Sequence, residues 1–397
     1  MTTATQTIND LTTQIGTLGV RGSTQPLSRN YSLDKWQNFA VNPAIGQEFG
    51  KDLQLSEIVH AANKDELLRD LAVLISQRGV VFFRAQDIGL EDQKTLGRKL
   101  GELSGKPQDS ALHIHPFTPK DSEKGDQILV CVSAPAKNIG LTFVRSISAE
   151  RRNKRAQVED STRFASKGWH SDITFEPVPS DYAILKIHTA PENGGDTLWA
   201  SAYEAYSRLS PEFAKFLEGK EAFHEATSFN KYAEAAGITL RTDVRGSPLN
   251  SGPGLSAIHP VIRVNPVTGW KGLFVNQGFT KRILDVTKDE SDFILDYLFK
   301  LVNSNHDLQV RFKWGTGYAS RSVGDVAIWD NRSTVHAITQ DYEDAERVGD
   351  RVVSLGEKPY FDPAGTTRRK DLGLPEPTHD ASVLGEAYRQ SVSSANE

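Results

Sequence analysis

Short strand signals follow one another through the last third of the chain, and this pattern restricts the possible folds more than any other feature. A helix expected at about 290–301 interrupts runs of β-branched and aromatic residues, which predict strands at 258–264, 272–276, 308–314, 325–330 and 351–355. Many short strands with inserted helices favour a β-sandwich or jelly roll over alternating strand–helix units. We therefore expect a mainly β protein with flanking helices.

The first half of the chain predicts a helix packed against a buried strand. Asn63 followed by Glu66 is compatible with a capped helix start. Leucine and isoleucine side chains then recur at helical spacing through residues 67–75. Gly79 is expected to end this helix, and Val80–Phe83 is typical of a buried strand.

The length of 397 residues suits one domain with tails. Residues 1–45 are polar without clear periodicity and predict a partly ordered N-terminal arm. We expect the folded domain at 46–365 and a polar C-terminal tail at 366–397. Within the domain, the polar stretch 134–168 is compatible with a solvated loop or with a lid over a site that begins directly after it.

Composition excludes several classes of function. The net charge of −5 gives no reason to expect nucleic acid or a membrane surface as a partner. Cys131 is the single cysteine, so a disulfide within the chain and a multi-thiolate zinc or iron–sulfur site are ruled out. The N-terminal residues do not resemble a secretory signal, and the apolar runs are too short to span a bilayer, which leaves the cytoplasm as the expected location.

His170 and Asp172 are candidate metal ligands. In a strand, alternate side chains point to the same face, so these two would point the same way. Two histidines and one carboxylate on one face of a metal form the facial arrangement of non-haem Fe(II) oxygenases. A His-x-Asp alone is weak evidence, because it recurs by chance in chains of this length.

His336 is the candidate third ligand. The segment 325–336 predicts a strand, a tight turn at Asp330–Asn331 and a second strand that His336 enters. A ligand just after such a corner would be well fixed. The alternative reading is a hydrogen-bonded histidine of the core.

Two arginines and two glycines complete the pattern. Arg347 and Arg351 are four residues apart and share a face on either a helix or a strand. A guanidinium group near iron is what a dicarboxylate co-substrate needs at its distal carboxylate, although the local sequence alone favours surface ion pairs of either arginine with neighbouring acidic residues. Gly194 and Gly195 indicate a turn or bulge.

Together these segments resemble the taurine dioxygenase (TauD/TfdA-like) family between roughly residue 45 and residue 362. The similar motifs, in family order, are 112–116 (Leu-His-Ile-His-Pro), 169–172 (Trp-His-Ser-Asp), 194–199 (Gly-Gly-Asp-Thr-Leu-Trp), 273–276 (Leu-Phe-Val-Asn) and 328–332 (Ile-Trp-Asp-Asn-Arg). The Arg347/Arg351 pair fits the same order. The N-terminal arm and the long polar insertion look more like the fungal sulfonate dioxygenases of that family.

The resemblance implies a double-stranded β-helix core, which is a jelly-roll, cupin-like fold. It also implies Fe(II) on His170, Asp172 and His336, and 2-oxoglutarate on Thr197 and Arg347. Three further groups would bind the anionic group of the substrate. Its implied partners are the side chains of Arg351 and His115 and the backbone N–H of Ile173.

The implied function is an Fe(II)- and 2-oxoglutarate-dependent dioxygenase acting with O2 on a small anionic organic substrate. We expect hydroxylation next to the anionic group of a sulfonate, which releases sulfite and an aldehyde with succinate and CO2. The same chemistry on an alkyl sulfate, an aryloxyacetate or an amino-acid-derived metabolite is the alternative. A zinc hydrolase and a non-catalytic jelly-roll binding protein are more remote, and the family implies a homo-oligomer, either a dimer or a tetramer.

Overall fold

The computed structural model describes residues 25–120, 122, 124–133, 144–145, 165–315, 324–342, 345–377 and 385. The predicted lid at 134–168 lies outside the described residues, apart from β5 (Val144–Arg145) and a 3₁₀ turn, η2 (Ala165–Gly168). Residues 1–24 of the predicted arm and most of the predicted tail also lie outside them, so the domain bounds stay a prediction. None of the helices in the described part is both long and apolar enough to cross a membrane.

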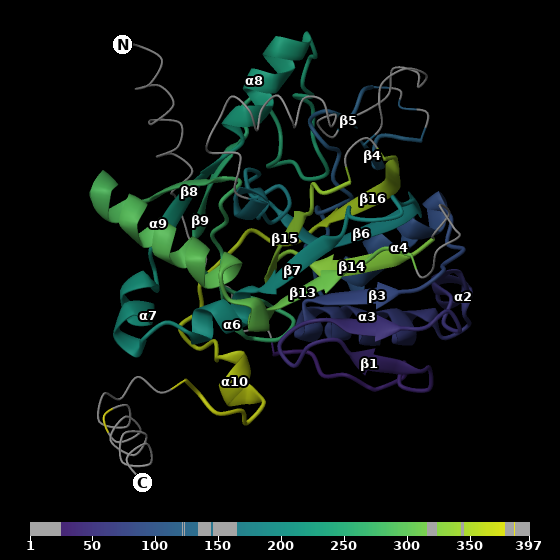
Figure 1. Cartoon of the computed structure of the whole chain (residues 1–397), viewed down its shortest axis with the longest axis horizontal. Helices are drawn as coiled ribbons and strands as arrows, with labels where there is room; N and C mark the ends of the chain where they lie inside the picture. Colours follow the sequence, from purple (N-terminus) through teal and green to yellow (C-terminus); the bar gives the residue numbers. More distant parts are fainter. Residues whose placement is uncertain are drawn as a thin grey trace.

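The larger of the two central layers is a mostly antiparallel sheet of eight described strands (Figure 1). In spatial order they are β1 (Asn38–Ala40), β2 (Gln47–Phe49), β3 (Val80–Phe83), β14 (Val326–Asp330), β6 (Ser180–Thr189), β16 (Arg347–Leu355), β4 (Leu129–Ser133) and β5. The β2–β3 and β4–β5 pairs are parallel. The described part of the predicted arm, residues 25–45, thus contributes the edge strand β1.

The second layer is an antiparallel sheet with β7 in its centre. Its described strands are β13 (Gln309–Phe312), β7 (Thr197–Ser201) and β15 (Thr334–Ile338). Aromatic side chains from both sheets fill the space between them: Phe82 stacks on Phe312 with ring centroids 4.1 Å apart, and Trp199 lies 5.7 Å from Trp329. This pair of facing sheets is the predicted jelly-roll core.

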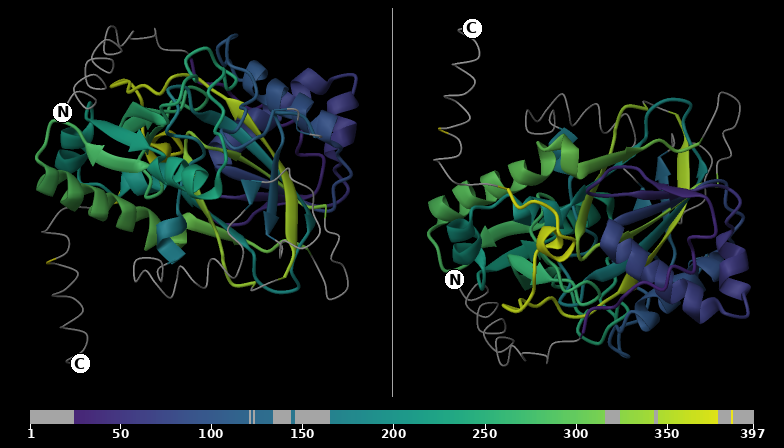
Figure 2. Two further views of the ribbon diagram at one scale, coloured as in Figure 1. Left: turned by 90° about the horizontal axis from the view of Figure 1, so that it is seen from above. Right: turned by 90° about the horizontal axis from the view of Figure 1, so that it is seen from below.

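Helices cover the outer face of the large sheet (Figures 1 and 2). They are α2 (Leu55–His60), α3 (Lys64–Arg78) and α4 (Leu90–Leu103). Leu68, Leu71 and Ile75 of α3 are buried in one cluster with Val81 and Ile328 of the sheet, as the helical spacing predicted. The side chain of Asn63 does not cap α3, but donates to Glu66 instead.

The remaining elements flank the small sheet and one end of the sandwich (Figure 1). The strands are β8 (Glu221–Glu225), β9 (Ser256–Pro260), β10 (Ile262–Val264), β11 (Lys271–Leu273) and β12 (Thr280–Ile283). The helices are α6 (Ala202–Ser207), α7 (Pro211–Leu217), α8 (Thr227–Ala236), α9 (Lys288–Asn303), η3 (His306–Leu308) and α10 (Arg368–Asp371). The mainly β fold with flanking helices is therefore confirmed.

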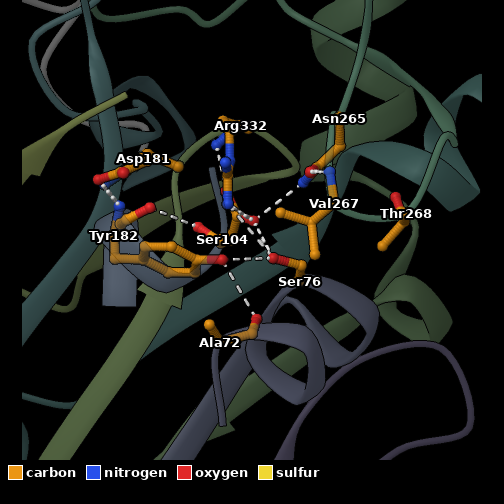
Figure 3. Close-up of polar contacts among 12 residues, drawn as sticks. Ala72, Ser76, Ser104, Asp181, Tyr182, Asn265, Val267, Thr268 and Arg332 are labelled. Atoms are coloured by element: carbon orange, nitrogen blue, oxygen red, sulfur yellow. Dashed lines mark hydrogen bonds and ion pairs between the residues drawn. The ribbon is translucent and has the colours of Figure 1, made fainter. Parts of the chain in front are cut away.

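A buried polar network fixes the turn that joins β14 to β15 (Figure 3). Asp330 accepts hydrogen bonds from Ser76 Oγ at 2.7 Å, Asn265 Nδ2 at 2.9 Å and Arg332 Nη2 at 2.8 Å. Tyr182 reaches Ser76 with its hydroxyl at 2.9 Å. Burial alone would raise the pKa of Asp330, but Arg332 and the hydrogen bonds hold it below its usual range. A buried ion pair of this kind fixes the turn from which His336 follows.

We expect Arg332→Met to destabilise the protein strongly, because it leaves the Asp330 carboxylate buried without its cation. Loss of one partner of a buried pair costs about 3 to 5 kcal/mol. The free energy of unfolding would be measured by urea denaturation. Arg208→Met is the matched control, since Arg208 pairs with the largely exposed Asp307 and should cost about 1 kcal/mol or less. Similar losses for both variants would contradict a stabilising role for the network.

Candidate metal centre

His170 and His336 are held side by side by their backbones. The two residues form an isolated antiparallel bridge, in which His170 N donates to His336 O at 2.9 Å and His336 N donates to His170 O at 2.7 Å. The two ring centroids lie 4.3 Å apart. Residues that are distant in the sequence are thereby brought to one point in the middle of β15, with both imidazoles on the same side.

Asp172 completes a group of three potential ligands. Its Oδ1 lies 3.9 Å from His170 Nε2 and 3.8 Å from His336 Nε2, and one ligand atom from each residue falls within 4.8 Å of the others. Metal–ligand bonds of roughly 2 Å place the ligand atoms of a shared ion roughly 3 to 4 Å apart. The three side chains therefore have the spacing that a divalent metal requires, and two histidines with one carboxylate are the donor set of a facial Fe(II) site.

The hydrogen bonds around the imidazoles leave ligand nitrogens free. His170 Nδ1 lies 2.9 Å from Gly168 O, which can only accept, so Nδ1 carries the proton and Nε2 keeps its lone pair. His336 Nδ1 is buried and has no hydrogen-bond partner in the described part of the chain. Burial lowers the pKa of both histidines, so both imidazoles are neutral at pH 7, as metal binding requires.

Two polar side chains hold the Asp172 carboxylate. Asn331 accepts from the Asp172 backbone N–H at 3.1 Å, and its Nδ2 lies 3.4 Å from Asp172 Oδ2. Arg351 Nη1 donates to Asp172 Oδ1 at 2.8 Å. Burial opposes ionisation of Asp172, but the positive charge of Arg351 and the hydrogen bond from Asn331 hold its pKa below its usual range. The carboxylate is therefore ionised and oriented before any ligand binds.

Local backbone features allow this close packing. Ile173 adopts φ +51°, a left-handed conformation that is strained for a β-branched residue and therefore has to be imposed by its surroundings. Gly278 lies against the first histidine, and a Cβ at this position would come within 2.9 Å of His170 Cβ. The positions 173 and 278 thus fix how the chain passes the metal ligands.

Arg347 and Thr197 form a second contact group beside the triad. Arg347 is buried, and it donates to Gly195 O at 2.9 Å and to Thr197 Oγ1 at 3.2 Å. Trp314 Nε1 donates to the same hydroxyl at 3.1 Å. Gly194 and Gly195, with φ of +74° and +69°, make the predicted turn. Because Thr197 and His336 lie on the same face of the small sheet, the group faces the metal ligands.

Arg347 forms no ion pair within the described part of the chain, although its guanidinium is buried. Burial lowers the pKa of Arg347, yet an arginine stays charged at pH 7. A buried cation without an anion is costly, which is the condition that an incoming carboxylate would relieve. The alternative reading of Arg347 as a surface residue is therefore wrong.

His115 approaches the same place from the segment before β4. His113 N donates to Val353 O at 2.8 Å and Leu355 N to Ala111 O at 3.0 Å, so this segment lies along the end of β16. Phe117 N donates to His115 Nδ1 at 3.3 Å, which assigns the ring proton to Nε2. Burial, with the positive charge of Arg351 nearby, holds the pKa of His115 well below its usual range. His115 is thus a neutral hydrogen-bond donor.

The structure therefore brings the predicted residues to one end of the sandwich, and it adds three that were not predicted to act there. Asn331 was expected only as a turn residue, and Trp314 only as the last residue of a predicted strand. Cys131 lies opposite Gly349 on β16, between the positions of the two arginines, and burial raises the pKa of its thiol. The position of Asn331 directly after Asp330 in a tight turn was the one signal that could have identified it.

Comparisons with known proteins agree with this geometry. A family model described as "Taurine catabolism dioxygenase TauD, TfdA family" matches residues 37–353. The chain is 40% identical over 391 residues to the alpha-ketoglutarate-dependent dioxygenase esdpJ of Penicillium shearii, which covers 90% of this chain and 99% of that protein. It is 33% identical over 333 residues to an alpha-ketoglutarate-dependent sulfonate dioxygenase of Saccharomyces cerevisiae, and this alignment covers 81% of this chain and 67% of that protein.

A solved structure, a taurine dioxygenase from Burkholderia xenovorans, aligns with a TM-score of 0.58 and 25% identity. The alignment covers 83% of this chain and 92% of that one. The fungal relatives are named for their use of alpha-ketoglutarate, which is 2-oxoglutarate, and their names differ in whether a substrate is given.

We expect Asn331→Ala to weaken Fe(II) binding by about 10- to 100-fold, because residues that orient a ligating carboxylate carry an effect of that size. The affinity would be measured by anaerobic titration of the metal-free protein. Asn305→Ala is the matched control, since Asn305 donates to Leu301 O at the end of α9 and does not contact the triad. Equal affinities for wild type and Asn331→Ala would show that Asp172 is held well enough without the amide.

Proposed function

The chain belongs to the TauD/TfdA family of dioxygenases, and from this we propose that it hydroxylates a small organic anion, a sulfonate, at the carbon next to the anionic group. It is an alpha-ketoglutarate-dependent dioxygenase that uses Fe(II) and 2-oxoglutarate. The observation that carries the substrate proposal is the pair of donors, Arg351 and His115, beside the triad. A zinc hydrolase or a non-catalytic binding protein has no support from the family.

In this proposal His170, Asp172 and His336 hold the iron. When it is bound with 2-oxoglutarate, Fe(II) supplies the oxidising chemistry, in which O2 is consumed as 2-oxoglutarate loses CO2 and becomes succinate. The protein contributes two neutral histidines and one ionised carboxylate as ligands, and Asn331 sets the orientation of that carboxylate. Fixing these groups in advance lowers the cost of alignment.

Arg347 and Thr197 would bind the distal carboxylate of 2-oxoglutarate. The carboxylate would supply the anion that the buried guanidinium of Arg347 does not find among the described residues. Thr197 already accepts from Arg347 and from Trp314, so its own hydroxyl proton points elsewhere and can be donated. These two donors would set the orientation of the co-substrate.

Arg351 and His115 would bind the anionic group of the substrate, with the backbone N–H of Ile173. Arg351 Nε is buried and has no hydrogen-bond partner among the described residues, so this guanidinium can still donate. Its contact with Asp172 Oδ1 uses an oxygen that is also a candidate ligand atom, so a metal there would compete with Arg351 for it. A sulfonate placed here would present its adjacent carbon to the reaction centre, and the α-hydroxy product would break down to sulfite and an aldehyde.

The two arginines should have separable roles. We expect Arg351→Ala to raise KM for an anionic substrate by about tenfold or more and to change KM for 2-oxoglutarate little, since a charge-assisted bond to one ligand is lost. Arg347→Ala should instead raise KM for 2-oxoglutarate and change KM for the anionic substrate little. Steady-state kinetics with each ligand varied would measure this, and Fe(II) affinity would be checked for both variants because Arg351 contacts Asp172. Equal effects of both substitutions on both ligands would refute the division.

The direct test of the proposed function is product release from the purified enzyme with Fe(II), ascorbate and 2-oxoglutarate. We expect succinate and sulfite in equal amounts with at least one alkyl sulfonate, and neither product from His336→Ala. Alkyl sulfates, aryloxyacetates and amino-acid derivatives would be assayed in parallel. Succinate that depends on one of these compounds, with no sulfite from any alkyl sulfonate, would reject the sulfonate and retain the dioxygenase.

A further inference from the structure

A continuous row of aromatic rings leads from the candidate metal centre to α8. Phe279 lies 6.1 Å from His170, Phe229 lies 5.9 Å from Phe279, and Phe117 lies 5.1 Å from Phe229, measured between ring centroids. Tyr232 follows at 5.6 Å from Phe117. We call Phe117, Phe229, Tyr232 and Phe279 the aromatic row.

The members of the aromatic row come from three separate parts of the chain. Phe229 and Tyr232 are three residues apart on α8, so they lie on one face of that helix. Phe117 belongs to the turn after His115, in which Thr118 N donates to His115 O at 2.8 Å. Phe279 follows β11. Packing against one another in edge-on and tilted geometries fixes the rings in place.

The row is open at its outer end. Phe279 is buried, whereas Phe117, Phe229 and Tyr232 are only partly buried. A group of neighbouring aromatic rings that keeps part of its surface accessible is a candidate ligand-binding surface, whereas a single partly exposed ring is not. Figure 1 shows α8 standing beyond the end of the sandwich, next to β8. The accessible ring surface therefore lies at the outer end of the row, and the buried Phe279 connects it to His170.

The aromatic row also flanks the group proposed to hold the anion. The ring of His115 stacks on Phe117 at 5.7 Å and lies 5.5 Å from Phe229. A substrate whose head group is bound by His115 and Arg351 would have its body against these rings. Apolar surface recognises an apolar body, with a gain roughly proportional to the area removed from water.

We infer that the aromatic row binds the body of the substrate, and that this body is aromatic or an extended apolar chain. The inference rests on the proposed function for the position of the anionic group. It narrows the substrate class to an organic anion larger and more apolar than taurine. Phe229 and Tyr232 are then the residues that set specificity, because both contribute rings to the row from one face of α8.

The test measures binding without turnover, by calorimetry on the anaerobic enzyme loaded with Fe(II) and 2-oxoglutarate. Three matched pairs of probes share a head group and differ by one phenyl ring: ethanesulfonate and 2-phenylethanesulfonate, ethyl and 2-phenylethyl sulfate, propanoate and 3-phenylpropanoate. We expect the phenyl member to bind about tenfold more tightly or better in at least one pair. Taurine should bind more weakly than that phenyl compound.

Variants assign the preference to the row. Phe229→Ala and Tyr232→Ala should each reduce the preference for the phenyl compound to about threefold or less. They should lower the affinity for the short probe less than the affinity for the phenyl compound, and they should leave the affinity for 2-oxoglutarate unchanged. Phe229→Leu should keep part of the preference because it retains apolar volume. Phe293→Ala on α9, which removes an aromatic side chain that is 76% exposed, is the matched control and should change nothing.

The outcomes separate this inference from the proposed function. A phenyl preference in the sulfate or carboxylate pair, with no binding of either sulfonate, supports the binding role of the aromatic row and rejects a sulfonate as the substrate. A preference below about threefold in every pair, or no binding of any phenyl compound, overturns the inference. A phenyl preference that survives both alanine variants also overturns it. An equal loss of affinity for both members of a pair, together with a lowered Tm, overturns it too, because that result indicates a structural role alone.

Discussion

The reciprocal backbone bridge between His170 and His336 is the contact on which the rest of the site depends. Its two hydrogen bonds join the segment before β6 to β15, and they fix both imidazoles relative to one another. Asn331, in the turn before β15, then holds Asp172. The spacing of the ligand atoms thus follows from backbone pairing and one amide, and the buried Asp330–Arg332 pair keeps that turn in place.

The two arginines of β16 are directed to two different places by one strand. Arg347 is buried against Gly195 and Thr197, while Arg351 contacts Asp172. Both side chains enter the space between the sheets, at four-residue separation, with Gly349 between them. The same guanidinium chemistry is directed to two positions by its neighbours, so under the proposed function position on the strand, rather than residue type, would separate co-substrate from substrate.

Much of this arrangement is readable from the sequence, and the reasons for the exceptions are physical. The late strands, α3 and the tight turn have local signals, and the structure has all of them. The central strand β6 has no alternating pattern, since both faces are buried and Asp181 and Lys186 lie among its apolar residues, so periodicity could not predict it. The aromatic row joins side chains of three segments, and no local pattern encodes such proximity.

The location of the triad at the junction of the two layers has a consequence for the apoprotein. His336 belongs to the small sheet, whereas Asp172 is held by Arg351 of the large one. A metal shared by these residues would act as a cross-link between the layers, so part of its binding energy would appear as resistance to unfolding. The layers should then exchange amide hydrogens more readily without metal, and the metal-free chain should open more easily to proteases.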